Sequence, residues 1–253
     1  MLKKRLIPSL LLQNGRCVKG IHFDNMRDVG NPVTAARVYD AQGADELFFL
    51  DISASHENRS ALLHIIRETA EQCFMPLTVG GGVRSVDEIR DLLLAGADKV
   101  SINTAALQRP EFIREAARKF GSQCVVVAMD VRKENGDYRI YTHGGRNATD
   151  WHPLEWAKAA VAHGAGELLV VSIDRDGTRE GYDLELLRMI ADAVSVPVVA
   201  AGGCGTLEHF VQAIREGHAS AVSAASIFHF TDQSPIKARY YMQVAGLDVR
   251  PIL

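Results

Sequence analysis

The sequence has few cysteines and no pattern of metal ligands. Its four cysteines are spread over 253 residues and form no C-x-x-C pair, so neither a zinc site nor a disulfide framework is expected. The nine histidines show no H-x-x-x-H spacing, and each is more readily explained as a surface or packing residue. We therefore expect no metal ion and no cofactor.

The chain also lacks a long apolar run and an excess of charge of either sign. Basic residues at 3–5 precede an apolar run at 6–12, which is interrupted by Pro8 and Ser9 and is too short to cross a bilayer. No signal-peptide cleavage pattern follows it. A net charge of −3 and a pI near 6.3 predict no nucleic-acid partner and no membrane association. These features favour a cytoplasmic protein.

Short apolar runs alternate with amphipathic stretches along the whole chain. Runs rich in Val, Leu and Ile are typical of strands buried on both faces, and a 3.6-residue apolar period is typical of helices packed on a sheet. The predicted strands are 6–11, 46–51, 76–79, 99–102, 124–130, 167–173, 196–201 and 219–223. The predicted helices include 58–73, 86–94, 110–120, 154–163, 184–194 and 207–216.

Eight strand–helix alternations predict a parallel sheet with crossover helices. Eight units in this length favour an α/β fold of one domain, residues 1–253, closed as a (β/α)₈ TIM barrel; a doubly wound sheet is the alternative. Two connections are long, 13–31 and 131–151, and 137–141 in the second could form a small hairpin. In a barrel these loops lie at the C-terminal face, where active sites are found.

The two halves of the sequence resemble each other. The segment 43–47 (GADEL) recurs as 164–168 (GAGEL), and the glycine pair at 81–82 recurs at 202–203. One inserted residue later, 100–104 (VSINT) matches 222–226 (VSAAS). Three matches in register predict two similar half-barrels of four βα units each, against the alternative of chance similarity between βα units.

Each half carries a glycine pair after one strand and a small polar residue after the next. Glycine lets the backbone approach an oxyanion closely, and a hydroxyl near a helix N-terminus adds a donor. The first predicted phosphate cradle is Gly81, Gly82, Asn103 and Thr104. The second is Gly177, Gly202, Gly203, Ala225 and Ser226. Two cradles imply a small substrate with a phosphate at each end, whereas the alternative is that these glycines only make tight turns.

Several motifs together resemble the cyclase subunit of imidazole glycerol phosphate synthase, over essentially the whole chain. They are R-x-I-P at 5–8, GR-x-VKG at 15–20, RD-x-G at 27–30, FLDI at 49–52, VGGG at 79–82, KVSINTA at 99–105, SIDRDGT at 172–178 and ASIFHF at 225–230. The resemblance implies a barrel that takes ammonia from a glutaminase partner and uses it on a linear bis-phosphorylated ribonucleotide. It also implies catalytic roles for Asp130, Lys19 and Asp176.

The first strand departs from the family pattern. The family has Ile-Pro-Cys-Leu-Asp-Val there, with the aspartate acting as the second acid or base, whereas this chain has Leu11 at that place. Leucine cannot transfer a proton, so the standard cyclisation should be badly impaired. The triple leucine at 10–12 resembles a paralogous branch linked to sugar amidation in surface-polysaccharide pathways, as do 73–77 and 141–143.

Four charged residues stand at predicted strand starts, on the face away from the loops: Arg5, Glu46, Lys99 and Glu167. Solvated ion pairs are one interpretation, and such pairs contribute little to stability. The resemblance implies instead an ammonia gate above a docked glutaminase subunit in a heterodimer, with Asp98 at the interface. Three functions stay open: a cyclase or lyase of histidine biosynthesis, an ammonia-dependent sugar-amidating relative, and a non-catalytic barrel that activates its glutaminase. An isomerase of the same fold is a more distant fourth.

Overall fold

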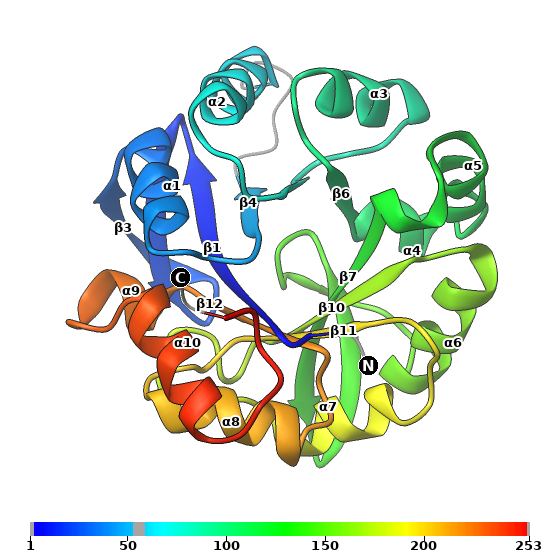
Figure 1. Cartoon of the computed structure of the whole chain (residues 1–253). Coiled ribbons are helices and arrows are strands. Elements are labelled where there is room, and N and C mark those ends of the chain that lie inside the picture. Colours follow the sequence, from blue (N-terminus) through cyan, green and yellow to red (C-terminus); the bar gives the residue numbers. More distant parts are fainter. Residues whose placement is uncertain (1–2, 53–58, 252–253) are drawn as a thin grey trace.

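Eight parallel strands close into a barrel in the computed structural model, which describes residues 3–52 and 59–251. The barrel strands are β1 (Arg5–Gln13), β4 (Leu47–Asp51), β5 (Leu77–Gly80), β6 (Lys99–Ile102), β7 (Val125–Glu134), β10 (Glu167–Ser172), β11 (Val198–Ala201) and β12 (Ala221–Ala224). Each pairs with the next in this order, and β12 pairs with β1 to complete the circle (Figure 1). The predicted (β/α)₈ barrel is confirmed, and the doubly wound alternative is wrong.

Helices surround the barrel in chain order (Figure 1). They are α1 (Pro32–Ala41), α2 (Arg59–Gln72), α3 (Val86–Leu94), α5 (Glu111–Phe120), α6 (Pro153–His163), α7 (Leu184–Ala191), α8 (Leu207–Arg215) and α10 (Pro235–Val244). The shorter helices are α4 (Thr104–Gln108), α9 (Ser226–Phe230) and the 3₁₀ turn η2 (Ser122–Cys124). The predicted helix at 58–73 begins with Asn58, which lies outside the described residues. Among those residues, no helix has the length and apolar character needed to cross a membrane.

Local sequence signals fix where several helices begin and end. Helix α3 starts at a capping box, in which the Ser85 hydroxyl accepts the Glu88 amide and the Glu88 carboxylate accepts the Ser85 amide. Helix α6 starts with Pro153, whose fixed φ suits a first helical position, and ends at Gly164 in the left-handed conformation. These signals explain why 86–94 and the end of α6 are predictable from sequence.

The internal repeat is present in the structure. Helix α3 (Val86–Leu94) and helix α8 (Leu207–Arg215) have the same length 121 positions apart, as do β5 and β11. Strand β6 and strand β12 likewise match 122 positions apart, after the one-residue insertion. The barrel is therefore built from two similar half-barrels, as predicted.

An antiparallel hairpin follows the first strand of each half. Strands β2 (Arg16–Ile21) and β3 (Asp24–Gly30) extend from β1, and β8 (Asp137–Thr142) and β9 (Asn147–Ala148) extend from β7. The sequence predicts a small hairpin at 137–141, but the structure makes this segment a single strand, β8, which pairs with β7 and β9. The first hairpin lies in a segment for which only a long connection is predicted. Both stand at the C-terminal end of the barrel, which we call the mouth.

Side chains alternate between two hydrophobic cores. On β4, Leu47 and Phe49 point outward and join the large core between strands and helices. Phe48 points inward and packs with Ile7, Leu169, Val199 and other residues on the barrel axis. The alternation follows from the two-residue period of a strand. It identifies which residues of each strand face the barrel interior and the mouth.

Candidate functional site

Asp130 lies inside the mouth, near the end of β7, where the two-residue period turns it inward. Its Oδ2 accepts a hydrogen bond from Asn103 Nδ2 at 2.8 Å. The pKa of Asp130 is raised to about 7: burial is the largest cause, the Asn103 hydrogen bond lowers it, and the negative charge of Asp176 also raises it. A carboxyl group with a pKa near neutrality can both accept and donate a proton at physiological pH, as a general acid–base residue must.

Leu11 occupies the position in β1 that Asp130 occupies in β7. Leu11 pairs in register with Leu50 of β4, and Asp130 pairs with Val171 of β10. Positions 50 and 171 are equivalent in the 121-residue repeat, so the two half-barrels place a leucine and an aspartate at matching points of the mouth. Leu11 is half-buried and supplies no proton there.

Lys19 and Asp176 form a buried ion pair that joins the β2–β3 hairpin to the loop after β10. Lys19 Nζ lies 2.9 Å from Asp176 Oδ1 and 2.7 Å from Oδ2, and the Lys19 side chain is only 3% exposed. The His22 amide donates to the Asp176 carbonyl at 2.9 Å. These bonds hold the hairpin over the mouth, and the negative charge of Asp176 acts on Asp130.

Removing the lysine charge should loosen the hairpin and destabilise the fold. Replacing Lys19 by Met leaves the Asp176 carboxylate buried without its partner, which should cost about 3 kcal/mol of unfolding free energy. Amide hydrogen exchange in β2 and β3 should accelerate. The matched control is Lys133→Met, because Lys133 pairs with the exposed Glu185 and its loss should change stability little. Equal, small effects of both variants would show that the buried pair does not hold the hairpin.

Phe23, at the tip of the same hairpin, is not predicted from the sequence. It packs against the inward-facing core of the barrel, and its φ of 64° places a bulky residue in the left-handed region. A Cβ added at Gly145 would lie 3.0 Å from the Phe23 ring, so the two hairpins meet above the mouth. No local sequence signal indicates this contact, because it depends on how the hairpin folds back.

The first predicted cradle lies between β5 and β6. Gly81 has φ 109°, and a Cβ there would lie 2.1 Å from the Asp51 carbonyl oxygen, so this position requires glycine. Thr104 begins helix α4, and its Oγ1 accepts the His143 amide at 3.0 Å. That bond occupies a lone pair and leaves the hydroxyl proton of Thr104 free to donate. His143, which the sequence analysis does not assign to the site, thus connects the second hairpin to this cradle.

The second predicted cradle repeats this arrangement between β11 and β12. Gly202 has φ 87°, and a Cβ there would lie 2.6 Å from the carbonyl oxygen of Ser172, the repeat equivalent of Asp51. Ser226 begins α9, as Thr104 begins α4. Gly177 is packed against the first hairpin, where a Cβ would lie 2.5 Å from the Gly20 carbonyl oxygen. Phosphate binding at the two cradles remains a prediction.

The four charged strand starts meet at the opposite, N-terminal end of the barrel. Arg5 Nη1 lies 2.6 Å from Glu46 Oε1, Arg5 Nη2 bonds Glu167, and Lys99 Nζ lies 2.9 Å from Glu46 and 3.0 Å from Glu167. We call this arrangement the floor ring. Both carboxylates are buried, and although burial alone lowers the pKa of Arg5, Glu167 and Glu46 raise it well above its ordinary value. Each charge of the ring bonds both neighbours of opposite sign, so the ring is closed.

Asp98 lies beside the floor ring on the same face. It is exposed, and its Oδ2 accepts the Leu77 amide at 2.8 Å, which ties it to the start of β5. Two large apolar side chains are exposed where neighbouring helices end on this side: Phe74, 91% exposed after α2, and Leu94, 79% exposed at the end of α3. Single exposed apolar side chains are common on protein surfaces, so a partner on this face remains a prediction.

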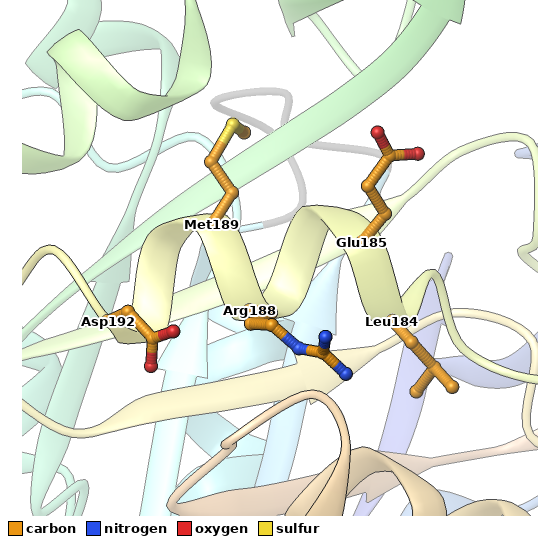
Figure 2. Close-up of a pocket in the computed structure, with 5 residues that line it drawn as sticks. All are labelled: Leu184, Glu185, Arg188, Met189 and Asp192. Atoms are coloured by element: carbon orange, nitrogen blue, oxygen red, sulfur yellow. The ribbon is translucent and has the colours of Figure 1, made fainter.

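A separate surface hollow lies away from both ends of the barrel interior. Figure 2 labels its lining residues: Leu184, Glu185, Arg188 and Met189 come from helix α7, and Asp192 directly follows the end of that helix. None of them is a predicted site residue, and Glu185 is already paired with Lys133.

The structure thus brings Asp130, Lys19 and Asp176 together at the mouth and places Arg5, Glu46, Lys99 and Glu167 in one ring at the other end. A family model described as histidine biosynthesis protein matches residues 5–234. The match begins with β1 and ends just before α10, so it includes all eight barrel strands. The chain belongs to the histidine biosynthesis protein family.

Proposed function

We propose that this chain uses ammonia from a glutaminase subunit on a small phosphorylated substrate, as an enzyme of the cyclase-subunit type. The observation that carries the proposal is the closed floor ring. Inward layers of barrels of this fold are dominated by branched apolar residues, and a buried ionic network is weak evidence for stability because apolar packing often serves as well. Four mutually bonded charges across the barrel opening are better explained by a gate for a small neutral molecule.

The proposed glutaminase docks on the face that carries Asp98, Phe74 and Leu94. Phe74 and Leu94, here called the apolar patch, are exposed side chains that a partner would cover. A docked partner is needed because ammonia released into solvent would be protonated before it reached the floor ring. Charged substitutions in the patch should separate the subunits without disturbing the mouth, which lies at the other end of the strands.

At the mouth, the proposed substrate is held by a phosphate at each cradle. Asp130 then takes and returns protons as ammonia attacks the substrate and the imidazole ring of the product forms. Its pKa of about 7 lets both the protonated and the ionised carboxyl group be populated. Lys19 and Asp176 close the hairpin over the substrate and exclude water. In the reaction that the family resemblance implies, the products are imidazole glycerol phosphate and an aminoimidazole carboxamide ribotide.

Leu11 favours a second candidate function. With one carboxyl group in place of two, the mouth lacks half of the acid–base pair of the standard cyclisation. Ammonia delivery could then serve the amidation of a sugar carrying a phosphate or nucleotide. Growth of a histidine auxotroph that lacks its own cyclase subunit is the test: rescue by this chain supports the first function, and failure with soluble protein supports sugar amidation or a non-catalytic barrel that activates its glutaminase.

The test of ammonia delivery is purification of the tagged chain from its native cell, followed by an assay of the eluate for glutamine hydrolysis. We expect a glutaminase to copurify with the wild-type chain and to be lost from Leu94→Asp. The matched control is Val244→Asp, because Val244 is comparably exposed, at 69%, on the outer helix α10. Absence of glutaminase from the wild-type eluate, together with no product from added ammonium salts, would contradict the proposal.

A further inference from the structure

Asn103 has an unusual set of contacts for its position. It precedes helix α4, where an asparagine side chain commonly accepts a backbone amide as an N-cap, yet it makes no such bond. Its side-chain nitrogen donates instead to Asp130. Its side-chain oxygen, Oδ1, is buried and has no hydrogen-bond partner among the described residues.

A buried acceptor without a partner is costly, and native structures rarely leave one. Oδ1 can only accept a hydrogen bond. A phosphate group at neutral pH offers mainly acceptor oxygens and cannot satisfy it, and the donor nitrogen of the same side chain is already used by Asp130. Oδ1 is therefore an acceptor suited to a bound group that donates a hydrogen bond, such as an N–H group.

Asn103 also stands at the upper end of a line of polar residues inside the barrel. The two-residue period of β6 turns Lys99, Ser101 and Asn103 inward in succession, from the floor ring to the mouth. Ser101 is 3% exposed, and a Cβ at Gly80 would lie 2.8 Å from its Cβ and 3.0 Å from Leu50. Phe48 and Ile7 make part of the interior apolar. Thr78, in register with Phe48 and Lys99, and Ser223, in register with Ile7, are also buried inward-facing polar residues. Strand β6 therefore supplies one polar side of the interior between the two ends.

We propose that Asn103 Oδ1, together with the Asp130 carboxyl group, is the site that receives ammonia where the barrel interior opens into the mouth. This assignment rests on the proposed function. Ammonia has three N–H donors and one lone pair, and an amide oxygen binds an N–H and leaves the lone pair free for attack. The side chain of Asn103 is then a binding residue for the nitrogen substrate, and phosphate binding at the first cradle depends on the glycines and Thr104.

The proposal predicts different effects for Asn103→Ala and Thr104→Ala, whereas a phosphate-binding role for both residues would predict the same effect. Asn103→Ala should raise the KM for ammonium salts at least tenfold in turnover of the linear bis-phosphorylated ribonucleotide, while its Kd for inorganic phosphate stays within twofold of wild type. Thr104→Ala should raise the Kd for inorganic phosphate and leave the KM for ammonium salts within twofold of wild type. If Asn103→Ala weakens phosphate binding and leaves the KM for ammonium within twofold, Asn103 is a phosphate ligand and the proposal is wrong.

Undetectable turnover would count against the proposed function and not against the ammonia site. A binding measurement tests the site in that case. The probe is ammonium chloride, with tetramethylammonium chloride as a cation that cannot donate N–H bonds. In protein carrying ¹³C-carboxyl aspartate, ammonium should move the Asp130 titration of the wild type to lower pH, and tetramethylammonium should not. Loss of this response in Asn103→Ala supports the site. An equal response in both proteins overturns it.

Discussion

Replacing Leu11 by Asp should raise turnover of the linear bis-phosphorylated ribonucleotide with ammonium salts by about 100-fold or more. General acid–base catalysis contributes roughly 10²–10⁴-fold, and Leu11 occupies the position that is equivalent to Asp130 in the other half-barrel. The new carboxyl group would supply the second proton-transfer residue at the mouth. The measurement is the steady-state rate at saturating ammonium, compared with the low rate expected of the wild type.

Leu11→Asn is the control for this gain, because asparagine has nearly the same shape and cannot transfer a proton. It should leave the rate at the wild-type level. A folded Leu11→Asp variant with no gain would mean that the mouth has a further defect for this reaction, and would favour the sugar-amidation function. A wild-type rate within tenfold of an ordinary cyclase subunit would remove the reason for the experiment altogether.

Replacing Asp130 by Asn should abolish the proposed chemistry and stabilise the protein at alkaline pH. Burial is the first cause of the raised pKa, from 3.8 to about 7, so the folded state holds this proton more tightly than the unfolded chain. Stability therefore falls as the pH rises from about 4 to 7, and about 4 kcal/mol is lost once the pH exceeds 7. Asparagine keeps an oxygen that can accept the Asn103 amide and carries no charge.

The pH dependence of unfolding tests this prediction. The gain of Asp130→Asn over wild type in denaturant titrations should be larger at pH 8 than at pH 5.5, by about 2 kcal/mol. A difference that does not change with pH would show that Asp130 ionises normally in the folded protein. Its role as a residue that exchanges protons near neutrality would then lose its physical basis.

Much of the barrel can be predicted from the sequence because its signals are local. The segment 86–94 has a capping box and an apolar period, and 99–102 is a short run of buried-strand residues; the structure places α3 and β6 at those bounds. The membership of the floor ring is likewise predictable, because the starts of parallel strands meet at one end of a barrel. The repeat adds a second, independent indication of each of these elements.

The mouth is less predictable, since its contacts join residues far apart in the chain. Lys19 pairs with Asp176, which lies 157 positions away in the sequence. The Asn14-Gly15 pair is a hairpin-turn signal, and both residues have positive φ where β1 turns into β2. No local signal indicates that the β2–β3 hairpin then folds over the mouth. The neighbouring strands β6 and β7 place Asn103 near Asp130. Whether the Asn103 side chain donates to Asp130 or caps helix α4 depends on its rotamer. Such choices are decided by packing and not by local pattern.

The floor ring also has a consequence for how the two half-barrels recognise each other. Glu46 and Glu167 are repeat equivalents, but both cations, Arg5 and Lys99, come from the first half. At this end the first half carries one excess positive charge and the second half one negative charge. Two copies of the first half would bring excess cations together on the axis, and two copies of the second would bury carboxylates without counter-ions. The charges of the floor ring are therefore complementary between the two halves. They favour the pairing of a first half with a second half over the pairing of two identical halves.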